Sequence, residues 1–132
     1  MQPRFHIVMF HPEIPHNTGA AGRLALATGS RLHLIKPLGF SLDEKHVRRT
    51  GLDYWAKVDL HVWDSLEELK QAAAPGAQFW YLSTKAPRSH WDAVFHAGDY
   101  LVFGPESRGL PESMLREHAD TALTIPMQIG RA

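Results

Sequence analysis

The sequence contains no cysteine, which excludes disulfide bonds and thiolate metal sites and leaves nothing that points to an oxidising compartment. No apolar stretch approaches the roughly 18 residues that a membrane-spanning helix needs. The amino-terminal residues also lack the long apolar run and the small-residue cleavage site of a signal peptide. We therefore expect a soluble, cytoplasmic protein with no membrane partner.

An excess of charge of either sign is also missing, because 14 basic residues balance 14 acidic ones. Net charge therefore predicts no nucleic-acid partner, and a surface for one must come from local clustering of basic residues. Neither the G-x-G-x-x-G fingerprint nor a G-K-[ST] phosphate loop is present. The nine histidines include no pair with the i, i+4 spacing of a zinc-binding helix. We expect no metal and interpret the histidines as scattered surface and core residues.

What the sequence does contain is an alternation of short β-rich runs with helical patterns. Its 132 residues fit one domain, and a hydrophobic content of 44% is enough to build a core. The alternation predicts an α/β fold with a mainly parallel six-stranded sheet and helices on both faces. One expected helix opens with Ser65 and Glu68, which have the spacing of a capping box. We expect strands at 4–10, 31–37, 56–63, 77–84, 99–104 and 121–127, and helices at Thr18–Ala27, 41–51, 64–73 and 110–119.

The junction after the first expected strand, HPEIPHNTGAAGRLALATG at residues 11–29, is a candidate site. In open parallel sheets, ligands bind beyond the carboxyl ends of the strands, where this junction should lie. Asn17 or Thr18 is expected to cap the helix. Arg23 would then lie about 9 Å farther along the helix axis than Asn17. The simpler alternative is a capped helix that carries one solvated arginine.

A second candidate is FGPESRGLP at residues 103–111, which follows the fifth expected strand. Gly104, Glu106 and Gly109 predict a rigid turn with exposed backbone amides, to which an adenine or a ribose hydroxyl could hydrogen-bond. The alternative is an ordinary connection from a strand to a helix.

The remaining strand ends add polar and basic residues. LSTK at 82–85 and TIPMQIG at 124–130 should reach the same edge of the sheet. The densest basic patch follows the second expected strand and contains Lys45, Arg48 and Arg49. A phosphate backbone could dock there despite the zero net charge. The alternative is a solvated helix face with i, i+4 ion pairs.

Three segments together resemble a known family, the knotted SPOUT-class RNA methyltransferases. They are HPEIPHNTGAAGRLALATGSRLHLIKPLGF, RRTGLDYW and DYLVFGPESRGLP followed by TIPM, in the family's order from residue 7 to residue 127. The similarity is closest to the small tRNA ribose 2′-O-methyltransferases that act on the wobble cytidine or uridine. It implies a fold with a carboxyl-terminal trefoil knot, S-adenosyl-L-methionine as cofactor without a metal, tRNA as substrate and a homodimer.

The resemblance also implies roles for individual residues. In the family an arginine is proposed as the base, and Arg23 holds its position here. Because a guanidinium has a pKa above about 12, we interpret Arg23 instead as neutralising the oxyanion that develops on the ribose. The residues implied are Asn17, Arg23 and Glu106 for catalysis, Leu82, Gly104, Gly109, Ile125 and Met127 for the cofactor, and Lys45, Arg48, Arg49 and Lys85 for RNA.

The sequence departs from the family at its end. The family's third motif and carboxyl-terminal helix would follow IPMQIGRA, whereas the sequence stops at Ala132. We therefore expect one SPOUT-like domain over residues 1–132 from which the knot-closing segment is missing, which would impair this form. The alternatives are the same transfer onto another tRNA or ribosomal RNA position, and a non-catalytic RNA-binding module of the same fold.

Overall fold

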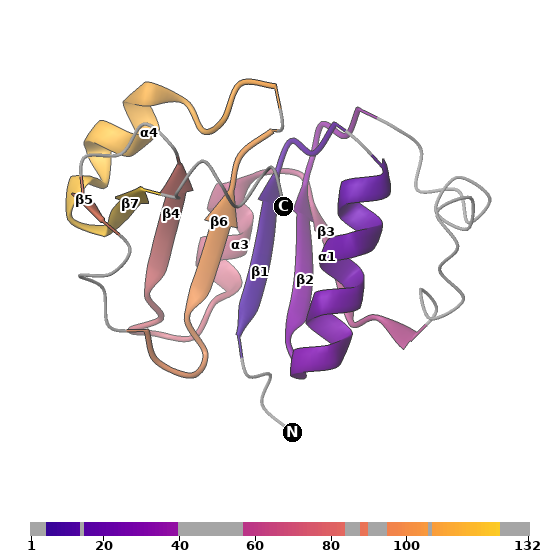
Figure 1. Ribbon diagram of the computed structural model, residues 1–132. Helices are drawn as coiled ribbons and strands as arrows, with labels where there is room; N and C mark the ends of the chain where they lie inside the picture. Colours follow the sequence, from indigo (N-terminus) through magenta and orange to yellow (C-terminus); the bar gives the residue numbers. More distant parts are fainter. Residues whose placement is uncertain are drawn as a thin grey trace.

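The computed structural model describes residues 5–13, 15–39, 57–83, 88–89, 95–105 and 107–124. Within these ranges no helix has the length and apolarity needed to cross a bilayer. The elements are β1 (His6–Phe10), α1 (Pro15–Thr28), β2 (Arg31–Ile35), β3 (Leu60–Trp63), α3 (Leu66–Ala72), β4 (Phe79–Ser83), β5 (Arg88–Ser89), β6 (Tyr100–Phe103), α4 (Glu112–Glu117), a 3-10 turn (Ala119–Thr121) and β7 (Ala122–Thr124) (Figure 1).

The strands form one parallel sheet in the order β3-β2-β1-β6-β4-β7-β5. The six expected strands are all present, and the two-residue strand β5 extends one edge. From β1 the chain moves outward through β2 and β3, and it later returns to place β6 on the other side of β1. The strand order therefore switches between β1 and β6, and ligands of such sheets bind beyond the carboxyl ends at this point.

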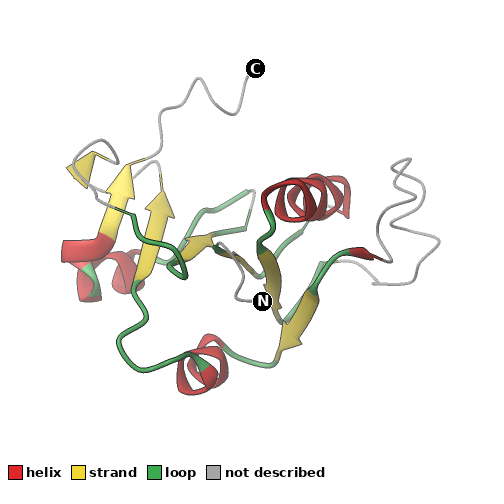
Figure 2. Cartoon of the chain, turned by 90° about the horizontal axis from the view of Figure 1, so that it is seen from below, coloured by secondary structure: helices red, strands yellow, loops and turns green. Residues whose placement is uncertain are grey.

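Helices cover both faces of the sheet, as predicted (Figures 1 and 2). On one face α1 packs its Ala25 with Ile7 and Leu32. On the other face, Leu66 and Leu69 of α3 and Leu115 of α4 pack in a single core cluster with side chains of the central strands. Small residues on the inner side of α1 include Gly22 and Ala25, both buried, which lets this helix lie close to the strands.

Helix α1 begins earlier than the sequence predicts. It starts at Pro15, so Asn17 and Thr18 lie inside its first turn and the expectation that either caps the helix is wrong. Proline is favoured at a first helical position because its fixed φ suits the helix and its missing N–H would have no partner there. Thr18 is instead fully buried, and its hydroxyl has no hydrogen-bond partner among the described residues.

Ser65 caps α3 as predicted, whereas the Glu68 carboxylate accepts from the residue before the cap and not from Ser65 itself, as a capping box would require. Ser65 accepts a hydrogen bond from the backbone N–H of Glu68 at 3.2 Å. The carboxylate of Glu68 accepts one from the backbone N–H of Asp64 at 3.0 Å. Helix α4 is shorter than expected, with Pro111 at its amino-terminal cap position. The expected helix at 41–51 lies outside the described residues.

Two buried histidines form a hydrogen-bonded chain on the α3 face. Trp63 Nε1–H donates to His33 Nδ1 at 3.0 Å, and His33 Nε2 lies 2.8 Å from His6 Nδ1. Because His33 Nδ1 must accept, its proton resides on Nε2 and is donated to His6. Tyr100 stacks on His6 with ring centroids 3.9 Å apart. The parallel register of β1, β2 and β6 thus gathers side chains that the sequence presents as scattered.

Candidate active site

The loops after β1 and β6 are joined at the switch point of the sheet. One carboxylate oxygen of Glu13 accepts hydrogen bonds from the backbone N–H and the hydroxyl of Ser107, each at 2.8 Å. The second oxygen lies 3.0 Å from the same hydroxyl. These hydrogen bonds, led by the one from the backbone N–H, lower the pKa of Glu13. The ionised carboxylate is therefore the form that holds the two loops together.

The loop after β2 packs against the same place. The backbone N–H of Gly39 donates to the carbonyl of Pro12 at 2.9 Å. A Cβ atom added at Gly39 would lie 3.0 Å from Cα of Glu13, so a side chain there would push the two loops apart. Loops from three strands consequently meet beyond the carboxyl ends of β2, β1 and β6.

The turn after β6 has the rigid geometry that the sequence predicts. A side chain at Gly104 would collide with the backbone of Gly109 and Leu110. Gly109 has a φ of +70°, which a residue with a side chain rarely adopts, and its N–H donates to the carbonyl of Pro105 at 2.8 Å. A Cβ atom at Gly109 would lie 3.9 Å from Oγ of Ser83 at the end of β4. The turn thus lies beside the end of a fourth strand.

A cavity of about 480 Å³ lies beside these loops, lined by Phe10, His11, Pro105 and residues 108–112. His11 has a positive φ of 53°, and its ring stacks on Phe10 with centroids 3.7 Å apart. Burial, and then the nearby guanidinium of Arg108, lower the pKa of His11. The cavity therefore presents a neutral imidazole, an exposed arginine and apolar walls at neutral pH.

The structure places several predicted site residues at this edge. Leu82 is buried in β4, while Gly104 and Gly109 form the turn beside it. Asn17 lies half-buried in the first turn of α1, which follows the carboxyl end of β1. Arg23 is exposed about two turns farther along this helix.

The other predicted site residues lie outside the described residues, and the roles of all of them stay predictions. This second set comprises Glu106, Ile125, Met127, Lys45, Arg48, Arg49 and Lys85.

Four residues at the carboxyl edge were missed by sequence reasoning: His11, Glu13, Ser107 and Arg108. Glu13 stands between two prolines in HPEIP, and a carboxylate held in so restricted a loop was the available signal. Its partner is 94 positions away, and no local pattern predicts that contact.

Comparisons with known proteins agree with this geometry. The SpoU rRNA Methylase family matches residues 4–131. A tRNA (cytidine(34)-2'-O)-methyltransferase of Saccharophagus degradans is 51% identical over 127 residues, which cover 93% of this chain and 80% of that protein. The protein of the same name from Methylovorus glucosotrophus is 48% identical over 110 residues, which cover 83% of this chain and 71% of that protein.

Solved structures show the same fold. One that concerns the 2-OH methylation of C/U34 on tRNA superposes with a TM-score of 0.86 at 47% identity, covering 93% of this chain and 80% of that one. A SpoU methyltransferase from Streptomyces viridochromogenes in complex with AdoMet has a TM-score of 0.72 at 23% identity, covering 96% of this chain and 50% of that one, a likeness of fold alone. The resemblance seen in the sequence is confirmed, and the chain belongs to the SpoU methylase family.

Proposed function

We propose that this protein transfers a methyl group from S-adenosyl-L-methionine to the ribose 2′-hydroxyl of the wobble cytidine or uridine of a tRNA. The observation that carries the proposal is the joining of loops at the carboxyl edge by Glu13 and Ser107. It occurs in a chain that is 51% identical to a tRNA (cytidine(34)-2'-O)-methyltransferase.

The described residues fit the cofactor. Leu82 gives an apolar contact at the end of β4, and the tight turn at Gly104 and Gly109 leaves backbone groups uncovered by side chains beside Ser83. An adenosyl group suits such a place, because it has an apolar ring with a hydrogen-bonding rim. Leu82, Gly104 and Gly109 would hold the cofactor, together with Ile125 and Met127. When bound, the cofactor supplies the electrophilic methyl group.

The residues of α1 would act on the ribose. Methyl transfer requires the hydroxyl oxygen to be aligned with the methyl donor, and such positioning can contribute roughly 7–11 kcal/mol. Asn17 at the start of α1 is placed to orient the ribose. The guanidinium of Arg23 would neutralise the charge that develops on the oxygen. Glu106, which lies outside the described residues, completes the proposed catalytic set.

A homodimer formed through α1 is part of the proposal. Leu24 is 56% exposed and Leu26 is 39% exposed, an unusual exposure for two leucines on one helix. At 100° per residue, Arg23 lies between them on the outer face of α1. A second copy that covers these leucines would also surround Arg23 and remove water from it. In this proposal Arg23 would lie at the subunit interface.

The tRNA would be held by local basic residues, because the chain has no net charge. Lys45, Arg48, Arg49 and Lys85 are the proposed contacts with phosphates, and we place the protein in the cytoplasm, where its substrate would be found.

The test is to incubate the protein and labelled S-adenosyl-L-methionine with bulk tRNA in one reaction and with ribosomal RNA in another. The methylated ribose is then mapped in each RNA. We expect label at position 34 of tRNA and its loss when that nucleotide lacks the 2′-hydroxyl. Label confined to ribosomal RNA or to another tRNA position would contradict the proposed substrate. Binding of tRNA without any transfer would instead support the non-catalytic module.

A further inference from the structure

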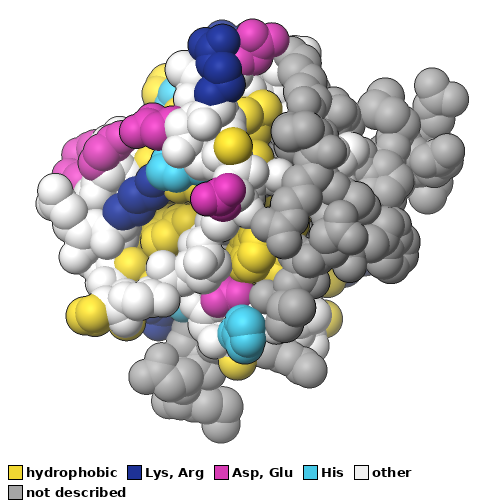
Figure 3. Space-filling view, turned by 90° about the vertical axis from the view of Figure 1, so that its left-hand side faces the viewer, with side chains coloured by type: hydrophobic (Ala, Val, Ile, Leu, Met, Phe, Trp, Pro, Cys, Tyr) yellow, Lys and Arg dark blue, Asp and Glu magenta, His cyan; other side chains and the backbone are white. Residues whose placement is uncertain are grey.

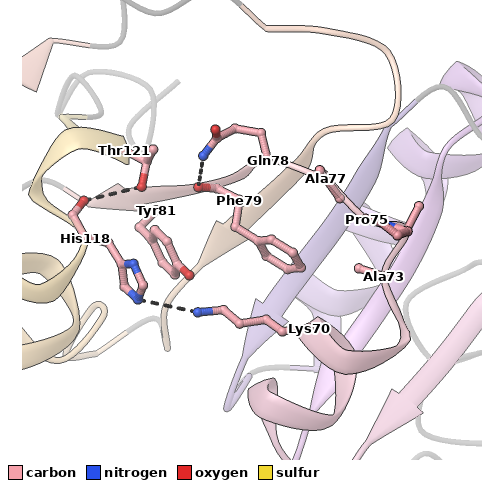
Figure 4. A pocket seen from close by; sticks show the side chains of 11 residues that line it. Lys70, Ala73, Pro75, Ala77, Gln78, Phe79, Tyr81, His118 and Thr121 are labelled. Atoms are coloured by element: carbon pink, nitrogen blue, oxygen red, sulfur yellow. Dashed lines mark hydrogen bonds between the residues drawn. The ribbon is translucent and has the colours of Figure 1, made fainter.

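A second cavity of about 400 Å³ lies near the amino ends of the strands, whereas the proposed active site lies beyond their carboxyl ends (Figure 4). Its lining comes from the end of α3, the turn before β4, the first residues of β4 and the segment before β7. All of these segments except α3 lie at or before the amino ends of parallel strands, whereas the proposed active site lies beyond the carboxyl ends. Figure 3 shows cationic, histidine and acidic side chains among hydrophobic ones on this side of the molecule. The cavity is therefore separate from the cofactor and ribose sites.

Two hydrogen-bond donors in this cavity are not fully used. Tyr81 is 1% exposed, and its hydroxyl has no hydrogen-bond partner among the described residues. Lys70 Nζ lies 3.4 Å from His118 Nε2, which leaves two of its three N–H groups available. Within the described part of the chain, no carboxylate forms an ion pair with Lys70. A buried hydroxyl without a partner costs stability, so these donors call for an acceptor.

Two other polar side chains of the lining already have a hydrogen-bond partner. The Thr121 hydroxyl donates to the carbonyl of His118 at 3.4 Å, and the Gln78 amide donates to the carbonyl of Phe79 at 3.1 Å. Figure 4 shows the His118 and Tyr81 side chains next to the Lys70 ammonium. The Tyr81 side chain, whose hydroxyl has no partner among the described residues, and the spare N–H groups of Lys70 thus lie together on one side of the cavity.

Aromatic rings fix the geometry of these three groups. The rings of Tyr81 and His118 stack with centroids 4.4 Å apart. The Lys70 ammonium lies 5.3 Å from the ring centroid of Tyr81 and 5.7 Å from that of Phe79. Cation–π contact and stacking therefore hold a cation, a phenol and an imidazole together without any bound ligand.

We propose that this cavity binds a phosphate group, carried either by a free nucleotide or by an RNA chain. A phosphate carries several acceptor sites, which match the spare N–H groups of Lys70, the Tyr81 hydroxyl and, once His118 is protonated and its hydrogen bond from Lys70 is replaced, the His118 ring. Burial, and then the nearby carboxylates of Glu117 and Glu67, raise the pKa of Tyr81, yet neither carboxylate pairs with Lys70.

Binding should be linked to protonation of His118. Burial, and then the Lys70 ammonium, lower the pKa of His118 in the free protein, while Glu117 opposes them. A bound phosphate would add negative charge next to the imidazole and raise this pKa. Phosphate affinity should therefore increase as the pH falls from 7.5 toward 6, although inorganic phosphate itself loses charge over that range. Short RNA separates the two effects, because its phosphodiesters keep the same charge over this range, whereas cytidine 5′-monophosphate titrates as inorganic phosphate does.

The test is an NMR titration of the 132-residue protein with inorganic phosphate, cytidine 5′-monophosphate and a short single-stranded RNA. We expect a saturable shift of the His118 ring signals and a raised His118 pKa in the bound state. Tighter binding of RNA, competed by phosphate, would identify an RNA chain as the source. Equal binding of the monophosphate and the RNA would identify a free nucleotide. Absence of a saturable shift with all three probes would overturn the proposal.

Three variants sharpen the experiment. Tyr81→Phe removes the unpartnered hydroxyl, so it should weaken phosphate binding roughly tenfold without lowering the melting temperature of the free protein. Lys70→Gln should abolish binding. The matched control, Lys57→Gln, makes the same charge change at an exposed lysine outside the cavity and should leave the affinity unchanged. Equal weakening by Lys57→Gln and Lys70→Gln, or unchanged affinity in Tyr81→Phe, would overturn the proposal.

Discussion

The carboxylate of Glu13 is hydrogen-bonded to both the backbone N–H and the hydroxyl of Ser107, at 2.8 Å in each case. This contact joins the loops that follow β1 and β6, the two strands at which the order of the sheet switches. A single ionised side chain thereby holds together the segment that leads into α1 and the turn that contains Gly104 and Gly109. We regard this contact as the structural basis of the proposed active site.

Removing this carboxylate should loosen the site while the sheet remains folded. In Glu13→Ala, the Ser107 amide loses its acceptor, and we expect its hydrogen exchange to become faster and methyl transfer to slow roughly tenfold or more. Ser107→Ala is the matched control, because it keeps the backbone N–H that donates to Glu13 and should have the smaller effect. An unchanged transfer rate in Glu13→Ala would show that the contact has no part in the activity.

Gly104 should tolerate no side chain. In Gly104→Ala, the added Cβ would meet the backbone of Gly109 and Leu110, so the turn must shift and cofactor affinity should fall. Gly98→Ala is the control, since Gly98 has a φ of +91° but no atom within 4 Å of an added Cβ. Strain alone should lower its stability by about 1–2 kcal/mol without changing cofactor affinity. Calorimetric titration and thermal unfolding of both variants test this expectation. An equal loss of cofactor affinity in the two variants would contradict it.

The buried histidine pair should make the fold sensitive to acid. Burial, and then the neighbouring His6, lower the pKa of His33 to about 3, against about 6.5 in an unfolded chain. Between these values the unfolded state binds more protons, so stability is complete above pH 6.5 and falls as the pH decreases. The slope from His33 approaches 1.4 kcal/mol per pH unit. Burial also lowers the pKa of His6, to about 4, which acts in the same direction.

Denaturant unfolding at pH 7 and pH 5 checks this linkage. The variant His33→Gln should be less stable at pH 7 but lose less stability between the two pH values. His96→Gln changes an exposed histidine outside the His6–His33 pair and serves as the control, for which we expect the same dependence of stability on pH as in the wild type. A pH dependence that is the same in His33→Gln and in the wild type would exclude His33 as its source.

The cap of α3 should be worth a measurable part of the stability. Ser65→Ala removes the acceptor for the Glu68 N–H and should cost about 1 kcal/mol of unfolding free energy. Ser65→Asp keeps an acceptor at the same position and should restore most of it. Urea unfolding of the two variants measures the difference, and equal stability of Ser65→Ala and the wild type would show that the cap contributes nothing.

Local patterns in the sequence predicted most of the fold, because hydrophobic alternation and capping residues act over a few positions. The six strands, the parallel sheet and the cap at Ser65 all follow from such patterns. The start of α1 did not, since the polar residues Asn17 and Thr18 favour a cap while Pro15 favours an earlier first turn. Strand β5, with two residues, is too short to leave a pattern.

The candidate site was predicted only in part, because some of its residues leave a local pattern in the sequence and others act through distant contacts. Gly104 and Gly109 stand out locally, because a tight turn needs glycine at defined positions. Glu13, Ser107 and His33 act through partners far away in the chain, and those contacts depend on strand order and register. No spacing within one segment could have indicated them.

The most direct test of the proposed function is the behaviour of Arg23→Ala. Methyl transfer to tRNA should fall by about 100-fold or more, while the affinity for S-adenosyl-L-methionine stays within about twofold of the wild type, because the guanidinium acts on charge that develops in the transition state. Sedimentation should show the same oligomeric state for both proteins. A normal transfer rate, or an equal loss of transfer and cofactor affinity, would contradict the role of Arg23 and with it the proposed reaction at this edge of the sheet.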